Sequence, residues 1–150
     1  MKKILHIILI FLFSLTIISC AKKSSSSSSD NTTTTDTTAP TVSSVSPTDN
    51  QSGVSITDNI SVTFSETMDT TYVTTNTSDT YCSGTLRVSS DNFSTCVKMS
   101  SSPASSNSDK TFTVDPSDNL SRATTYKIIV TTGVKDRAGN TLGSQYETSS

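Results

Sequence analysis

The chain has 150 residues, enough for one domain of ordinary size and some sequence outside it. Ser and Thr make up roughly two-fifths of the chain, which disfavours long helices because Thr is stiff at χ1 and Ser competes for backbone hydrogen bonds. The formal net charge is −2, and the sequence shows no basic patch that could bind phosphates. A nucleic-acid partner is therefore disfavoured.

The N-terminal segment has the features of a signal peptide. Two lysines precede the apolar stretch Ile4–Ile18, which at about fifteen residues is shorter than the roughly twenty that a membrane-spanning helix needs. Ser19 supplies a small residue just before Cys20, as at a signal-peptidase site. We therefore interpret residues 1–19 as a signal peptide that precedes a lipid-anchored cysteine. The alternatives are an ordinary cleaved signal, without a lipid, and a short membrane helix.

The stretch "TIISC" at the end of this segment resembles the lipobox of bacterial lipoproteins. The resemblance implies that the Cys20 thiol is lipidated and that Cys20 becomes the first residue of the mature chain. The membrane is then a partner through the N-terminal lipid. The expected location is the bacterial cell envelope, at the outer membrane or the cell surface.

Residues 20–38 are expected to form a disordered linker after the lipidated cysteine. Their sequence, "CAKKSSSSSSDNTTTTDTT", has no apolar side chain after Ala21, and such a segment cannot bury enough surface to offset its ordering entropy. The domain itself is expected to span residues 39–150.

Alternation of apolar and polar residues begins after Ala39. "NISVTFS" places Ile60, Val62 and Phe64 on one face, and "KTFTVDP" and "TYKIIVTT" show the same period, which is typical of half-buried strands. "GTLRVSS" and "FSTCVKM" predict two more strands, joined through "SSDN" as a hairpin, and "PTVSSVSP" predicts an edge strand between two prolines. The fold class is therefore all-β, an immunoglobulin-like sandwich of about seven strands.

Two blocks of this region resemble the bacterial Ig-like domain named for the SbsA surface-layer protein. They are "APTVSSVSPTDNQSGVSITDNISVTFSETMD" and "LSRATTYKIIVTTGVKDRAGNTL", and the resemblance covers residues 40–145. It implies an Ig-like sandwich of a kind found in secreted or surface-attached bacterial proteins, and it implies no activity. Because the chain stops at "SQYETSS", the last strand is expected to be short or truncated.

The residues that carry this resemblance are expected to be structural. Phe64 and Met68 would pack at a strand end, and Tyr126 resembles the tyrosine corner of Ig-like domains, whose hydroxyl bonds to upstream backbone. Gly139 and Asn140 suit turn positions with positive φ.

Two cysteines remain if Cys20 is lipidated. Cys82 and Cys96 are expected to form a disulfide in an exported chain, which would staple the predicted hairpin and contribute about 3 kcal/mol in the chain-entropy model. A redox-active or zinc-binding pair is the alternative, but the spacing is unsuitable and the ligands are too few.

Catalysis is not expected. The only histidine, His6, lies in the predicted signal peptide, so the mature chain has no imidazole for a triad or a metal site. No resident cofactor is expected either. Calcium is the exception to consider, because hard cations prefer clustered loop oxygens, although no spaced calcium loop is present. The candidate ligands are Asp49, Asp58, Glu66, Asp69 and Asp136.

Two classes of function remain. The favoured one is a non-catalytic structural or display module on the cell envelope. The alternative is an adhesin-like module, with or without calcium, that recognises a host or matrix protein or glycan through loops or a sheet edge. An exposed aromatic patch involving Tyr72, Tyr81 or Tyr146 would favour binding, and a surface covered with Ser and Thr would favour a spacer.

Overall fold

The computed structural model describes residues 34–149. The predicted signal peptide, the lipidation of Cys20 and most of the predicted linker lie outside the described residues.

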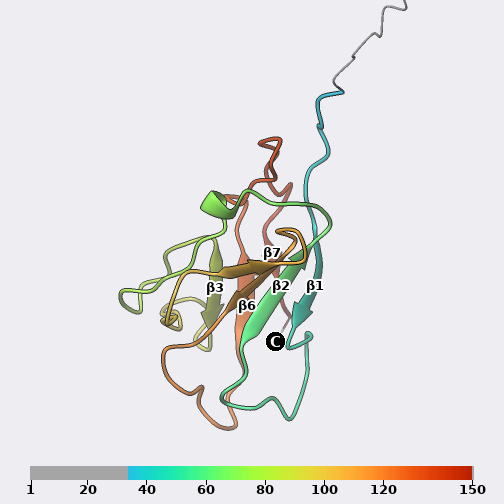
Figure 1. Cartoon of the computed structure of the whole chain (residues 1–150). Helices are drawn as coiled ribbons and strands as arrows, with labels where there is room; N and C mark the ends of the chain where they lie inside the picture. The colour runs from blue at the N-terminus through green and yellow to red at the C-terminus, as the bar shows by residue number, and fades with distance from the viewer. Residues whose placement is uncertain (1–33, 150) are drawn as a thin grey trace, which may run out of the picture. The chain divides into compact units, whose positions relative to one another are not determined.

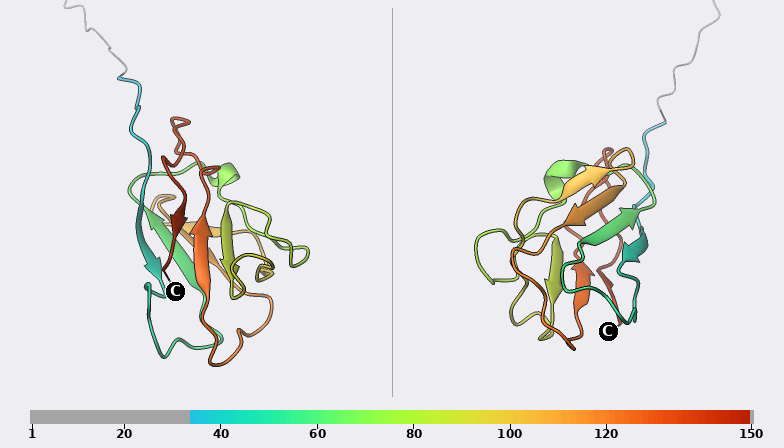
Figure 2. Two further views of the ribbon diagram at one scale, coloured as in Figure 1. Left: turned by 180° about the vertical axis from the view of Figure 1, so that it is seen from behind. Right: turned by 60° about the horizontal axis from the view of Figure 1, so that its bottom comes forward.

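The described chain is a sandwich of two antiparallel sheets with one 3-10 helix (Figure 1). One sheet has the strand order β1-β2-β5-β4 and the other the order β3-β6-β7, and the two views of Figure 2 show them face to face. The predicted all-β class with about seven strands is confirmed. The elements are β1 (Val42–Ser46), β2 (Ile60–Phe64), η1 (Thr70–Tyr72), β3 (Leu86–Ser89), β4 (Ala104–Ser106), β5 (Thr111–Val114), β6 (Lys127–Val130) and β7 (Tyr146–Glu147).

The core lies between the sheets and follows the alternation of the strands. In β2 the apolar residues are buried while Ser61 and Thr63 are half-buried. Val62 faces Phe112 across the β2–β5 pair, and the ring of Phe112 meets that of Phe64 edge to face at 5.9 Å between centroids. Fully burying one such side chain is worth about 1.5–3 kcal/mol, so these two central strands account for much of the stabilising burial.

The hairpin predicted between "GTLRVSS" and "FSTCVKM" is wrong. β3 forms, but the second segment has only an isolated bridge between Met99 and Pro116, and the amide of Val97 donates one bond to the carbonyl of Val88 at 2.8 Å. The reason lies in Asp91, which accepts from the amide of Thr95 at 2.9 Å. This bond closes a compact turn, after which the chain crosses to the other sheet.

β4 has no counterpart among the predicted strands. All three of its residues are exposed and none is a large apolar residue, so it carries no alternation to detect. It forms because its backbone pairs with β5 at the sheet edge. In β6, Ile129 is buried although the period placed it with Lys127 on the outer face. β7 has two residues, in line with the short last strand that was expected.

Candidate functional site

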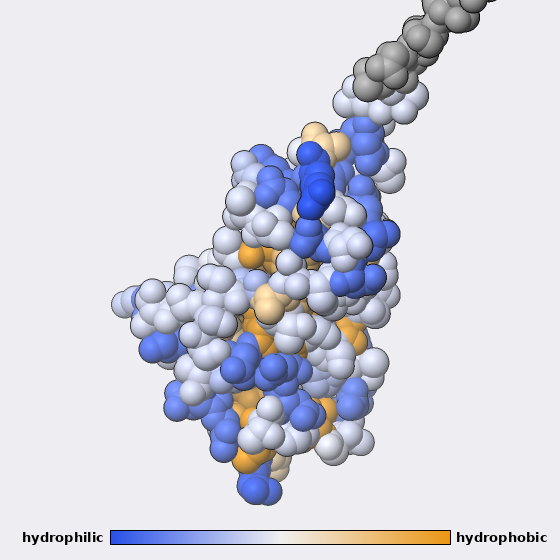
Figure 3. All heavy atoms as spheres, in the orientation of Figure 1, coloured by the Kyte–Doolittle hydropathy of each residue, from blue (hydrophilic) through white to orange (hydrophobic). Residues whose placement is uncertain are grey.

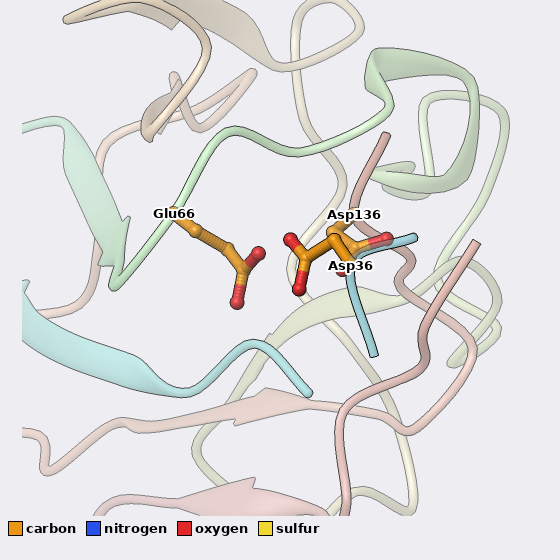
Figure 4. A group of neighbouring side chains, drawn as sticks. All are labelled: Asp36, Glu66 and Asp136. Carbon is orange, nitrogen blue, oxygen red and sulfur yellow. The ribbon is translucent and has the colours of Figure 1, made fainter. Parts of the chain in front are cut away.

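Three carboxylates from distant parts of the chain meet at one end of the domain. Asp36 precedes β1, Glu66 follows β2 and Asp136 follows β6, and one oxygen of each lies within 4.8 Å of the others. Figure 4 shows the Glu66 side chain pointing toward the two aspartates. The three residues, here called the acidic cluster, line a cleft of about 440 Å³ together with Lys110 and Arg137.

Asp136 is the structural member of the cluster. Its side chain is 2% exposed and accepts from the Asn140 amide at 2.8 Å and from Asn140 Nδ2 at 2.7 Å. Burial alone would raise the pKa of Asp136, but the bonds from Asn140 and from the Gly139 and Ala138 amides lower it on balance. Asp136 therefore closes the turn "DRAGN" as an ionised carboxylate.

Glu66 is the member whose charge is least favourable. The pKa of its half-buried carboxyl is raised, first by burial and then by repulsion from Asp136 and Asp36. Asp36 accepts the amide of Thr38 at 2.9 Å through its side chain. Its carbonyl accepts Asn140 Nδ2 at 3.2 Å, which attaches the segment before β1 to the β6–β7 loop. A proton on Glu66 or a hard cation would relieve the repulsion.

The remaining predicted calcium ligands lie elsewhere and accept hydrogen bonds from backbone amides. Asp69 caps η1, and the bonds that it accepts from the Thr71 hydroxyl at 2.7 Å and from the Thr71 amide at 2.9 Å lower the pKa of Asp69. Asp58 accepts from Ser55 at 3.1 Å, and Asp49 accepts the amide of Ser149 at 3.0 Å. The structure thus brings together Glu66 and Asp136 of the predicted set and adds Asp36.

The residues predicted to be structural lie where the fold needs them. Phe64 and Met68 are 2% and 0% exposed, and the Tyr126 hydroxyl accepts the Ser121 amide at 3.0 Å, the geometry of a tyrosine corner. Gly139 has φ of +95°. Asn140 is not among the positive-φ residues, so that prediction is wrong, and its amide side chain serves Asp136 instead.

Cys82 and Cys96 form a disulfide with Cα atoms 4.9 Å apart. Because the second strand of the predicted hairpin does not form, the bond joins the loop before β3 to the irregular segment after it. The disulfide therefore fixes two loops on the side of the sandwich rather than a hairpin.

The molecule also has a larger cleft, bounded by loops 47–56 and 120–126. It has a volume of about 740 Å³, and Ile60, Val88 and Ile128 form part of its lining. Its charged lining residues are Asp49 and Arg122, and Asp49 already accepts a backbone bond from Ser149.

Two of the three tyrosines whose exposure would favour a binding role are exposed. Tyr72 is 40% exposed and its ring is covered by Lys135 Nζ at 4.4 Å, whereas Tyr81 is 78% exposed. Tyr146 is half-buried against the core. Figure 3 shows apolar residues emerging in small separate areas on the face that it presents. Among residues 34–149 no helix has the length and apolar character needed to span a bilayer.

Comparison with known proteins identifies the domain. A family model described as "Bacterial Ig-like domain" matches residues 36–150. The N-terminal part of the bacterial S-layer protein SbsC is similar with a TM-score of 0.52 and 24% identity, over 73% of this chain and 23% of that one. The structure of SbsC domains 1–6 is similar with a TM-score of 0.52 and 25% identity, over 74% of this chain and 13% of that one.

The chain thus spans less than a quarter of the length of these S-layer structures. The search of curated proteins found no match. Because the family model covers most of the chain and the sandwich agrees with it, the chain belongs to the bacterial Ig-like domain family.

Proposed function

We propose that the protein is a cell-envelope lipoprotein whose Ig-like domain acts as a non-catalytic structural or display module. The observation that carries this proposal is the family match over residues 36–150. The similar solved structures are those of a bacterial S-layer protein, which supports a location at the cell surface. The lipobox-like sequence at Cys20 supplies the proposed attachment.

The outer face of the four-stranded sheet supports a spacer role. Its side chains are small and mostly hydroxylic, and the Thr63 and Thr111 hydroxyls bond to each other at 3.0 Å. Such a face is well solvated and offers no apolar anchor to a partner. The two rows across the strands are Ser44, Thr63, Thr111 and Ser106, and Ser46, Ser61, Thr113 and Ala104.

The absence of catalysis is proposed on the chemistry of the described groups. The acidic cluster holds carboxylates without a histidine, lysine or cysteine nucleophile directed at them. Lys110, beside the cleft, donates to the Ser65 carbonyl at 3.3 Å, and Arg137 pairs with Asp109 at 2.6 Å. Both cations thus have partners other than the cluster.

Acyl labelling of cells that express the full chain tests the anchor. We expect the wild type to incorporate a labelled fatty acid and Cys20→Ala to incorporate none, while a Cys82→Ala/Cys96→Ala variant is labelled like the wild type. Normal labelling of Cys20→Ala would refute the lipoprotein proposal.

Protease treatment of intact cells tests display separately. An outward-facing domain should be lost from the cells, while a periplasmic marker stays intact. A domain that survives in intact cells and is digested only after lysis would show that it faces inward.

The alternative of a calcium-assisted binding module remains a proposal, and the acidic cluster is the feature that favours it. Calcium takes six to eight oxygen ligands, and Asp136 already uses both carboxylate oxygens to accept bonds from Asn140. Any ion there would therefore rely mainly on Glu66, Asp36 and water. This geometry favours weak calcium binding. The melting experiment in the Discussion distinguishes weak calcium binding from no calcium binding.

A further inference from the structure

One loop projects sideways from the sandwich beside β3, and it carries the most exposed large hydrophobic side chain among residues 34–149. The loop comprises residues 76–83, here called the Tyr81 loop, and is the yellow-green segment that extends beyond β3 in Figures 1 and 2. Tyr81 is 78% exposed. The chain has four tyrosines, and the other three have structural contacts: Tyr72 with Lys135, Tyr126 in its corner and Tyr146 against the core.

The Tyr81 loop is folded around a buried amide. Asn76 is 5% exposed, and its Nδ2 donates to the Asp79 carbonyl, to Asp79 Oδ1 and to the Tyr81 carbonyl. Its Oδ1 accepts the Ser78 amide at 3.1 Å and the Asp79 amide at 3.3 Å. Asp79 in turn accepts the amide of Tyr81 at 2.9 Å. Both backbone polar groups of Tyr81 are therefore fixed from inside the loop.

The loop is also fixed at its neck. The amide of Thr85 donates to the Thr74 carbonyl at 2.9 Å. Gly84 has φ of +82°, and a Cβ there would come within 2.8 Å of the Thr75 Cα. Only glycine avoids both the strain and the clash. The two ends of the loop are thus held close together on the sandwich.

A third restraint comes from the segment after β3. The disulfide joins Cys82 to Cys96, and the Cys96 amide donates to the Thr80 carbonyl at 2.8 Å. Asp91 organises this segment, and the bonds that it accepts from Thr95 and Ser89 lower its pKa to about 2. Tyr81 therefore lies between two residues, Thr80 and Cys82, that are each attached to the ordered segment after β3.

An exposed ring on a fixed backbone is pre-organised for binding, because little conformational freedom remains to be lost. The surrounding side chains indicate the partner. The exposed neighbours in the loop are one carboxylate, Asp79, which accepts bonds from Asn76 Nδ2 and the Tyr81 amide, and four hydroxyl residues, Thr77, Ser78, Thr80 and Ser83. In a protein interface of standard size, about 800 Å² per partner, a tyrosine anchor lies in a packed, desolvated centre, and this loop has no apolar residues to form one.

We propose that the Tyr81 loop is a docking surface for a neutral polysaccharide. The C–H face of a pyranose ring stacks on the face of Tyr81, whose π electrons attract the weakly positive hydrogens, and the loop hydroxyls bond to sugar hydroxyls. This inference goes beyond the display role, since it states what the displayed domain contacts. It does not depend on Cys20, so a failure of acyl labelling and a failure of sugar binding are distinguishable.

Co-sedimentation of the detergent-solubilised full chain with cellulose, chitin and agarose-immobilised mannan tests the proposal. We expect retention on at least one polymer, about tenfold weaker retention of Tyr81→Ala, equivalent to about 1.4 kcal/mol, and wild-type retention of Tyr81→Phe, which keeps the ring. Tyr72→Ala is the matched control and should bind like the wild type. The melting temperature of Tyr81→Ala should be unchanged, since the side chain is exposed.

Three results would overturn the proposal. The first is no retention on any of the three polymers, and the second is equal retention of the wild type and Tyr81→Ala. The third is Tyr81-dependent retention on beads coated with protein but not on the polymers, which would assign the loop to a protein partner.

Discussion

The central strands and the Tyr81 loop are both ordered, but by different means. β2 and β5 bury alternate apolar side chains in the shared core. The Tyr81 loop exposes nearly all of its side chains and is held by one buried amide, one disulfide and a glycine at its neck. The first mechanism stabilises the whole domain cooperatively, whereas the second fixes a local shape on its side. The fold is thus a stable frame with a separately restrained loop.

The largest expected effect comes from the frame. Phe112→Ala removes a ring that is 1% exposed and packed against Phe64, so the free energy of unfolding should fall by about 3–5 kcal/mol. Urea unfolding followed by circular dichroism measures this change. Thr113→Ala, on the outer side of the same strand, is the control and should stay within about 0.5 kcal/mol of the wild type. Similar effects of the two substitutions would contradict the core assignment.

The disulfide connects the two mechanisms, because its loss acts partly through the unfolded chain. The bond spans 14 residues, and Cys82→Ser/Cys96→Ser should lower the free energy of unfolding by about 3 kcal/mol. Limited proteolysis should then cut first within residues 76–96, while the wild type resists at the same protease concentration. First cuts inside β2 or β5 would mean that the loop and the frame open together.

The buried amide affects the loop alone. Asn76→Ala leaves the Ser78 and Asp79 amides without their partner and removes one of the two bonds to the Tyr81 carbonyl, which still accepts the Ser83 amide. The free energy of local opening should therefore fall by about 1–3 kcal/mol. Hydrogen exchange of the Ser78 and Asp79 amides reports this opening. Asn50→Ala, in an exposed loop elsewhere, is the control. Unchanged exchange at these amides would show that Asn76 does not organise the loop.

The smallest effect concerns the acidic cluster. The folded-state pKa of Glu66 is raised, by burial and then by Asp136 and Asp36, so ionisation of Glu66 disfavours the folded state. The stability that protonated Glu66 contributes is therefore complete below the ordinary pKa of about 4.3 and is lost as the pH rises through the raised pKa. At pH 7, Glu66→Gln should have a slightly higher melting temperature than the wild type, and its free energy of unfolding should exceed that of the wild type by no more than about 0.5 kcal/mol, because the group is half-exposed. At pH 3 the two proteins should melt at the same temperature.

The same variant tests calcium. The calcium-assisted alternative predicts that millimolar calcium raises the melting temperature of the wild type but not of Glu66→Gln, with Asp58→Asn, outside the cluster, behaving like the wild type. A wild-type melting temperature that is the same in calcium and in chelator would end this alternative.

The sequence could predict the frame because burial leaves a period in it. Ile60, Val62 and Phe64 alternate with hydroxyl residues, and the structure buries all three as expected. β4 left no such signal, since its stability comes from backbone pairing with β5. The "SSDN" stretch was misread as a hairpin turn, because a capped turn closed by Asp91 has the same polar composition.

The acidic cluster was only partly predictable. Glu66 and Asp136 were candidates because they lie in loops, but Asp36 was placed in the linker because its neighbours are polar. Its proximity to the other two depends on the approach of three loops far apart in the sequence, which leaves no local pattern. The fixed shape of the Tyr81 loop was equally hidden, since it depends on five bonds of a single asparagine side chain.

Native-state hydrogen exchange of the wild-type chain at increasing urea tests the separation of frame and loop most directly. We predict two classes: amides of β2 and β5 that exchange only through global unfolding, and amides of the Tyr81 loop that exchange through a local opening of lower free energy and weaker urea dependence. A single free energy and urea dependence for both sets of amides would contradict the account, because the loop would then be part of the cooperative core.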